Sequence, residues 1–198
     1  MLMEVAFLRV GARVPVTRAE GPGARYALWV QGCSLRCPGC CNPHLFAAEG
    51  GTRLPVSALL AEVAAVRDEI EGVTFLGGEP FEQAASLACL ARGVRDFGLS
   101  VVVFSGYRLA ELQASADPGV PALLAATDVL VDGRYEASLP ETERLWAGST
   151  NQAFHYLTER YSPAIDRPGS GEPLREIEVR LPPTGRLEVN GWPEGAFR

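Results

Sequence analysis

The sequence contains no lysine, so all 18 of its Lys and Arg residues are arginine. Without a lysine amine the chain cannot form a Schiff base, an internal pyridoxal-phosphate aldimine or the phosphate contact of a Walker A loop. Its two histidines, His44 and His155, are too few for a three-histidine zinc site. A net charge of −6 gives no electrostatic signature of a nucleic-acid or anionic-membrane partner. Chemistry that needs a lysine amine is therefore excluded, and so is a three-histidine zinc site.

Long hydrophobic runs are also missing. No apolar run approaches the roughly 18–20 residues that a membrane span requires, and the start lacks the apolar core of a signal peptide. Four of the five cysteines fall within residues 33–41, whereas the disulfide framework of a secreted protein would spread them along the chain. We therefore expect a metal site in a reducing, cytoplasmic compartment and no membrane segment.

The 198 residues suit a single domain with a substantial core. Short apolar, β-rich runs alternate with stretches of helical period. The runs expected as strands are residues 26–30, 72–76, 99–104, 128–131 and 153–157, and the expected helices are 56–70, 81–97, 109–114 and 120–126. This alternation predicts βαβ units, an α/β fold with a parallel sheet, and functional loops at the carboxyl ends of the strands.

The composition changes after Tyr161. Residues 162–173 are rich in proline and glycine, which is typical of a linker or an exposed loop. Residues 176–181 and 186–190 then alternate like strands around Pro182-Pro183-Thr184-Gly185, a hairpin pattern. We expect a core domain over residues 1–161, followed by a linker and a C-terminal hairpin extension over 162–198.

The strongest motif is a C-x3-C-x2-C loop directly after the first of these strands. It consists of Cys33, Cys37 and Cys40. Three thiolates from such a loop can hold one corner each of an iron–sulfur cube and leave the fourth iron open for a substrate or cofactor. Cys41 is expected to be a bystander, because adjacent cysteines rarely point at the same metal from a short loop.

A structural zinc site is the alternative reading of these cysteines, with Cys41 or His44 completing the ligand set. Structural zinc sites usually pair two C-x2-C knuckles that lie far apart in the sequence, and this chain has only one. The spacing favours the cluster and leaves zinc as the second possibility.

A second motif, Gly77-Gly78-Glu79-Pro80, follows the strand expected at 72–76 and opens the helix expected at 81–97. Two glycines let a ligand approach the backbone closely, and exposed carbonyl groups there can accept hydrogen bonds from an ammonium group. Taken alone, the motif is equally well an ordinary turn between a strand and a helix.

Together, the cysteine triad and the GGEP motif resemble the signature of the radical S-adenosylmethionine superfamily. The sequence resembles most closely the activating proteins of anaerobic (class III) ribonucleotide reductase. The segments that carry this resemblance are residues 21–25, 37–42, 104–112, 129–135 and 146–152, with His155 just after them. The resemblance spans about residue 21 to about residue 160.

The resemblance implies a shortened, open (β/α) barrel of parallel strands with the cofactor at its carboxyl-end mouth. Cys33, Cys37 and Cys40 would hold a [4Fe–4S] cluster, whose open iron would bind S-adenosylmethionine. The cofactor contacts that it implies are Gly77, Gly78, Glu79 and Pro80 at the methionine amino group, and Ser105, Asp132 and Asn151 at strand ends. For each of the last three, an ordinary turn or strand-terminal role is at least as good an interpretation.

The activity implied is reductive cleavage of S-adenosylmethionine to a 5′-deoxyadenosyl radical, which takes a hydrogen atom from a glycine of the anaerobic reductase. The electron would come from a donor such as flavodoxin or ferredoxin. One alternative is a small radical S-adenosylmethionine enzyme that modifies a peptide or small molecule. Another is a zinc- or cluster-binding module without catalysis.

The sequence departs from the family pattern at three positions. Cys41 stands where an aromatic residue is common, Leu76 replaces a small polar residue before the GGEP motif, and Arg134 replaces a frequent lysine. Away from the motifs, Glu141 and Glu143 are expected to be solvated surface carboxylates.

Overall fold

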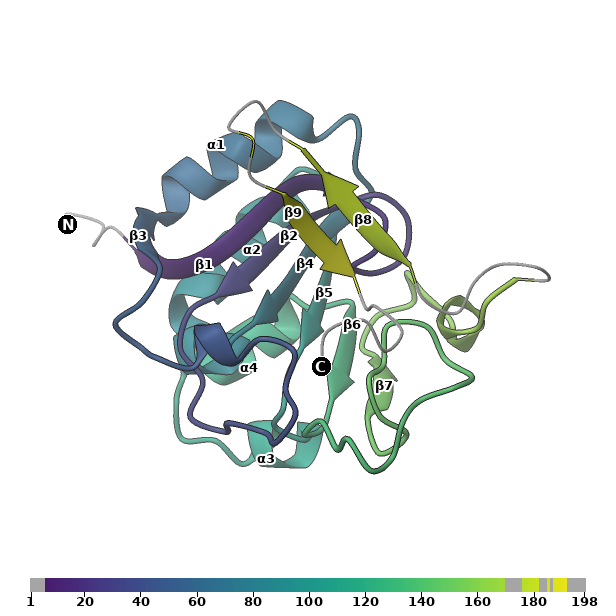
Figure 1. Cartoon of the computed structure of the whole chain (residues 1–198). Coiled ribbons are helices and arrows are strands. Elements are labelled where there is room, and N and C mark those ends of the chain that lie inside the picture. Colours follow the sequence, from purple (N-terminus) through teal and green to yellow (C-terminus); the bar gives the residue numbers. More distant parts are fainter. Residues whose placement is uncertain (1–5, 170–175, 182–184, 186, 192–198) are drawn as a thin grey trace.

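The structure is a computed structural model and describes residues 6–169, 176–181, 185 and 187–191. Its centre is a seven-stranded sheet with the order β3-β1-β2-β4-β5-β6-β7 (Figure 1). The strands are β1 (Phe7–Thr17), β2 (Arg25–Val30), β3 (Thr52–Pro55), β4 (Gly72–Gly77), β5 (Ser100–Phe104), β6 (Val129–Asp132) and β7 (Ala153–Tyr156). Strands β2, β4, β5 and β6 are parallel, while β1, β3 and β7 each run antiparallel to their neighbours.

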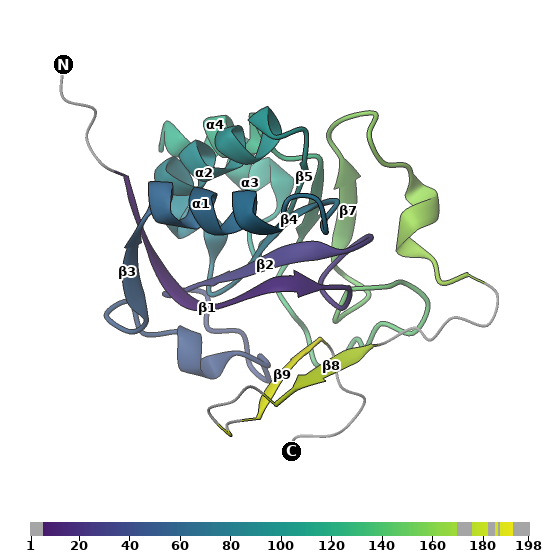
Figure 2. The ribbon, with the colours of Figure 1, turned by 90° about the horizontal axis from the view of Figure 1, so that it is seen from above.

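The α-helices of the described residues cover one face of this sheet, as Figure 2 shows. They are α1 (Val56–Val66), α2 (Ala84–Asp96), α3 (Leu109–Gln113) and α4 (Gly119–Ala125), with short 3-10 turns η1 (Pro43–Leu45), η2 (Pro80–Gln83) and η3 (Pro163–Asp166). The side chains of β2 alternate between the two faces. Leu28 and Val30 pack into the large core beneath the helices, whereas Ala27 and Trp29 belong to a smaller cluster on the other face.

The predicted α/β fold is confirmed as a mixed sheet with a parallel centre. The prediction fails at the edges, because β1 and β3 were not anticipated and β7 runs antiparallel to β6. The alternation of β1 is broken by irregular register between Val10 and Ala12 and between Val14 and Thr17. No helix separates β6 from β7, so the crossover that a parallel neighbour requires is missing.

A buried arginine lies at the amino ends of the parallel strands, on the side of the sheet opposite the predicted site. Arg25 opens β2, is 0% exposed, and donates hydrogen bonds to Thr74 Oγ1 (2.6 Å) and to the carbonyl oxygen of Val73 (2.7 Å). It also donates to Ser100 Oγ (3.1 Å), at the start of β5. A buried guanidinium is tolerated only when its donors are satisfied. Arg25 therefore ties together the amino ends of β2, β4 and β5.

The C-terminal hairpin is confirmed as β8 (Ile177–Arg180) paired antiparallel with β9 (Glu188–Gly191). Residues 170–173 of the expected linker and 182–184 of the expected turn lie outside the described residues. The hairpin lies on the side of the sheet opposite the helices (Figure 2). It contacts the body through polar groups: Asn190 Nδ2 donates to Thr17 Oγ1 (2.9 Å), and the Gly191 N–H donates to Glu20 Oε1 (2.7 Å).

The outward side of the hairpin is apolar. Its exposed large hydrophobic residues are Ile177, Val179, Leu181, Leu187 and Val189. In the part of the chain that the structure describes, no helix is both long and apolar enough to cross a membrane.

Candidate functional site

The cysteine loop begins where β2 ends, at the carboxyl edge of the parallel strands. Backbone hydrogen bonds fasten both sides of the loop: Gly32 N–H donates to the carbonyl of Leu45 (2.8 Å) and Cys33 N–H to that of Phe46 (3.2 Å). Arg36, between the first two cysteines, has a φ of 48°, a left-handed conformation that is costly for a residue with a side chain. The loop is therefore a tightly turned segment anchored at its base.

The chemistry of the three predicted ligands fits an iron–sulfur cluster. Cys33, Cys37 and Cys40 are free thiols and partly buried, whereas Cys41 is exposed. Burial raises the pKa of the Cys33 thiol, while a hydrogen bond with Cys41 lowers the pKa of Cys40 to about 6. The N–H of Asn42 also donates to Cys40 Sγ (3.4 Å). Soft thiolates with backbone N–H donors to sulfur suit iron–sulfur ligation.

The donor atoms are not gathered around a single point. Among the described residues, no three His, Cys, Asp or Glu side chains lie close enough together to hold one metal ion. In a [4Fe–4S] cluster each ligating thiolate binds a different iron atom. The assignment of Cys33, Cys37 and Cys40 therefore rests on the type of donor and on the loop that carries them.

The GGEP turn lies against the cysteine loop. The N–H of Gly78 donates to the carbonyl of Val30 and the N–H of Glu79 to that of Gly32, both at 2.8 Å. A Cβ atom on Gly77 would lie 2.6 Å from the Cα of Trp29, and one on Gly78 would lie 2.2 Å from the Gly32 carbonyl oxygen. Both glycines are thus required by close approach to the backbone, Gly77 to β2 and Gly78 to Gly32 just after it. The two motifs lie side by side, and contact with the methionine amino group stays a prediction.

The Glu79 side chain holds two site turns together. It is 1% exposed, and its carboxylate accepts hydrogen bonds from Phe81 N (2.9 Å), Ser105 Oγ (2.9 Å) and Gly106 N (2.8 Å). Burial raises the pKa of Glu79 to about 7, although these donors oppose the rise. Glu79 and Ser105, both predicted site residues, are therefore in direct contact, and they join the turn after β4 to the turn after β5.

Two residues that the sequence did not single out stand next to them in η2. Glu82 Oε1 accepts hydrogen bonds from Ser34 N (2.9 Å) and Ser34 Oγ (2.5 Å), on the cysteine loop. Gln83 accepts from the N–H of Arg9 (2.8 Å) and donates to the carbonyls of Arg9 and Gln31 (2.9 Å each). The available signal was their position in the first turn after the GGEP motif, where side chains face neighbouring loops.

Asp132 and Asn151 have different surroundings. Asp132 Oδ2 accepts from the N–H of Leu109 (2.5 Å), at the start of α3, and lies 2.9 Å from His155 Nε2. Leu130, two residues earlier in β6, packs into the core beneath the helices, so Asp132 lies on the helix side of the sheet. Asn151 Nδ2 donates to the carbonyl of Arg134 (2.7 Å), while its Oδ1 is buried without a hydrogen-bond partner in the described part of the chain. Cofactor contact by either residue stays a prediction.

The cysteine loop also reaches the turns that follow β5 and β6. A Cβ atom on Gly106 would lie 2.4 Å from Leu35 Cδ1. One on Gly39 would lie 3.3 Å from Ala137 Cβ and 3.5 Å from Tyr135 Cε1. The loop therefore spans the carboxyl edge of the sheet, from β2 to the segment after β6.

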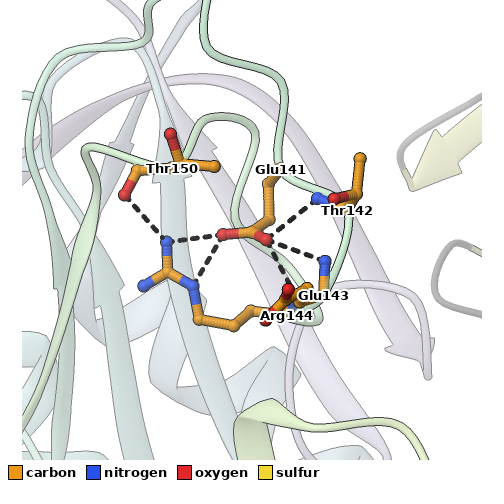
Figure 3. Close-up of a pocket in the computed structure, with 5 residues that line it drawn as sticks. All are labelled: Glu141, Thr142, Glu143, Arg144 and Thr150. Atoms are coloured by element: carbon orange, nitrogen blue, oxygen red, sulfur yellow. Dashed lines mark hydrogen bonds and ion pairs between the residues drawn. The ribbon is translucent and has the colours of Figure 1, made fainter.

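The segment between β6 and β7 contains a pocket of about 270 Å³, lined by Glu141, Thr142, Glu143, Arg144 and Thr150 (Figure 3). The expectation that Glu141 is solvated is wrong, because this residue is 3% exposed. Its carboxylate accepts from Thr142 N (2.9 Å), Glu143 N (2.8 Å) and Arg144 Nε (2.6 Å). Burial raises the pKa of Glu141, but these hydrogen bonds outweigh burial and leave the pKa below its ordinary value. The Glu141 carboxylate is thus held by donors of its own turn, which is a structural role.

Comparison with known proteins supports the class of site that the cysteine loop defines. The family described as a 4Fe-4S single cluster domain matches residues 19–155, so the chain is an iron–sulfur domain protein. The anaerobic ribonucleoside-triphosphate reductase-activating protein of Escherichia coli (strain K12) is 31% identical over 150 residues, which cover 72% of this chain and 95% of that protein.

Two further relatives bear the same name. The protein of Vibrio cholerae is 31% identical over 151 residues, 73% of this chain and 95% of its own length. That of Enterobacteria phage T4 is 31% identical over 146 residues, 70% and 87% respectively. The chain belongs to the family of anaerobic ribonucleoside-triphosphate reductase-activating proteins, which confirms the resemblance inferred from the motifs.

Proposed function

We propose that this protein is a radical S-adenosylmethionine enzyme that generates a glycyl radical on an anaerobic ribonucleotide reductase. The observation that carries the proposal is the contact between the three-cysteine loop and the GGEP turn, through the 2.8 Å hydrogen bond from Glu79 N–H to the Gly32 carbonyl. This contact lies at the carboxyl edge of a parallel sheet, where cofactors bind in such folds. The names of the relatives support the choice of partner.

Cys33, Cys37 and Cys40 would hold the [4Fe–4S] cluster. When bound, the cluster supplies the electron that cleaves S-adenosylmethionine to methionine and a 5′-deoxyadenosyl radical. The chain positions the cosubstrate with the backbone of the turn formed by Gly77 and Gly78. Asn151 Oδ1, buried and without a partner among the described residues, offers an acceptor for a donor group of the cosubstrate.

The proposal includes the barrel form of the fold. The sheet would be a shortened, open barrel of the radical S-adenosylmethionine type, with its inner face opposite the helices. Trp29 and Leu76 cluster on that face and would exclude water from the reacting groups.

The catalytic unit would be residues 1–161, with residues 162–198 as an extension. About 72% of this chain accounts for 95% of the Escherichia coli relative, so the alignment supports a shared core with additional residues outside it. We expect the protein to work in the reducing cytoplasm, without a nucleic-acid or membrane partner, and to take its electron from a flavodoxin- or ferredoxin-like donor.

The test is anaerobic reconstitution of the full chain, followed by iron and sulfide analysis and by assay of 5′-deoxyadenosine after reduction with S-adenosylmethionine. Cys37→Ser should lose both the cluster and 5′-deoxyadenosine release. Cys41→Ser is the matched control and should keep both, because Cys41 is exposed and assigned no ligand role. Incubation with an anaerobic reductase should then give a glycyl-radical signal by electron paramagnetic resonance.

Each alternative has its own outcome. Stoichiometric zinc without labile sulfide would refute the enzyme reading. Release of 5′-deoxyadenosine without a glycyl radical on the reductase would instead favour a peptide or small-molecule substrate.

A further inference from the structure

The turn η2 carries three side chains that each bind a different part of the site. Glu79, at its N-cap, bonds to the turn after β5, and Gln83 bonds to the ends of β1 and β2. Glu82 alone bonds to the cysteine loop, through both the N–H and the hydroxyl of Ser34. Glu79 and Gln83 thus explain how the turn is held, whereas Glu82 acts on the ligand loop itself.

Glu82 occupies a backbone donor next to a predicted ligand. The N–H of Ser34 belongs to the peptide that joins Ser34 to Cys33, and it points to Glu82 Oε1 at 2.9 Å. Tyr107 places its hydroxyl oxygen 3.5 Å from the same carboxylate oxygen and 3.4 Å from Ser34 Oγ. A peptide N–H held by a carboxylate is not available to donate to a cluster sulfur.

Both effects of this carboxylate act on a cluster in the same direction. Hydrogen bonds to the sulfurs and net charge are two of the quantities that set the reduction potential of an iron–sulfur cluster. A negative charge against the loop that would hold the cluster disfavours the added electron, and the loss of an N–H donor to sulfur does the same. Glu82 therefore favours the oxidised state.

We propose that Glu82 is a positioning residue that fixes the cysteine loop through Ser34 and makes the reduction potential of the cluster more negative. This inference rests on the proposed function, because it requires that Cys33, Cys37 and Cys40 hold a [4Fe–4S] cluster. A more negative potential makes the cluster a stronger reductant, which is what cleavage of a sulfonium requires. It also makes the cluster harder to reduce, so it restricts the donors that can serve it.

The test is a potentiometric titration of the reconstituted full chain, with the reduced cluster measured by electron paramagnetic resonance. In Glu82→Gln the side chain keeps an oxygen that accepts from Ser34 but loses its charge. At a fixed applied potential, its ratio of reduced to oxidised cluster should rise about tenfold, a positive shift of ~59 mV for one electron. Glu82→Asp keeps the charge and should stay within about twofold of the wild-type ratio.

Glu69→Gln is the matched control. It removes the same charge from an exposed residue that precedes β4, at the amino edge of the sheet, and should leave the ratio unchanged. A wild-type potential in Glu82→Gln with full iron content would overturn the proposal. Loss of iron from Glu82→Gln would also overturn it, because the amide oxygen retains the hydrogen bonds from Ser34.

The two proposals fail in different ways. A wild-type chain that binds no cluster refutes the proposed function. A wild-type chain that binds the cluster and releases 5′-deoxyadenosine, together with an unshifted Glu82→Gln, refutes only the role of Glu82.

Discussion

Glu79 makes the stability of the protein depend on pH in a way that one substitution reveals. Its carboxyl group is fully buried, and burial raises its pKa to about 7 from an ordinary value of 4.5. Because the folded pKa lies above the unfolded one, folding favours the protonated form. The resulting stabilisation is fully present below pH 4.5 and is lost as the pH rises through 7.

The size of the effect follows from this difference in pKa. One pKa unit corresponds to about 1.4 kcal/mol, so the full difference amounts to roughly 3 kcal/mol. Between pH 5 and pH 8, the wild-type protein should therefore lose about 2.5 kcal/mol of unfolding free energy that Glu79→Gln does not lose. Burial also raises the pKa of Glu20 to about 7, but this group is present in both proteins and cancels in the comparison.

Chemical denaturation of the metal-free protein at pH 5, 6, 7 and 8, under anaerobic reducing conditions, measures this quantity. Glu79→Gln should be less stable than the wild type at pH 5, because the amide N–H₂ group would face backbone N–H donors and could not accept hydrogen bonds from them. The difference in unfolding free energy between the two proteins should become smaller towards pH 8. The unfolding free energy of Glu69→Gln, a substitution at an exposed site, should change with pH as that of the wild type does. Parallel curves for Glu79→Gln and the wild type would refute the reasoning.

Two further pairs of substitutions, each a test and its control, examine local packing and hydrogen bonding by the same denaturation assay. Gly78→Ala should lose about 3 kcal/mol of unfolding free energy, because its Cβ would lie 2.2 Å from the Gly32 carbonyl oxygen. Gly98→Ala, with a φ of +79° but no atom within 4 Å, should lose only about 1 kcal/mol, and equal losses would contradict the steric argument. Glu141→Ala should cost about 2 kcal/mol, because it removes the charged acceptor of the hydrogen bonds from Glu143 N–H and Arg144 Nε. Glu143→Ala, with a side chain 75% exposed, should change stability by less than about 0.5 kcal/mol, and similar costs at both positions would count against the buried turn.

Local patterns predicted much of the fold. The parallel strands β2, β4, β5 and β6 are short apolar runs, and each formed close to its expected position. The C-terminal hairpin could be predicted because its apolar and polar residues alternate. The edge strands could not be predicted in the same way. The direction of β7 depends on the type of connection before it, and the irregular register of β1 interrupts its alternation.

The motifs of the site were predictable, but their supporting contacts were not. Spacing identified the cysteine loop and the GGEP turn, and family membership was inferred from them. The contact of Glu79 with Ser105 joins residues 26 positions apart, and that of Glu82 with Ser34 joins residues 48 positions apart. Such contacts depend on tertiary packing, which no local pattern encodes. Glu141 is a different case, because the donors to its carboxylate lie in its own turn, at Thr142, Glu143 and Arg144.

The C-terminal hairpin is energetically separate from the sheet that it lies on. Its hydrophobic side chains face away from the body, so its attachment depends on polar contacts such as those of Asn190 and Gly191 with Thr17 and Glu20. The hydrophobic effect, which holds the helices on the opposite face, contributes little here. The hairpin can therefore open as a unit of its own, at a lower free energy than global unfolding, while the sheet and the edge that carries the cysteine loop stay intact.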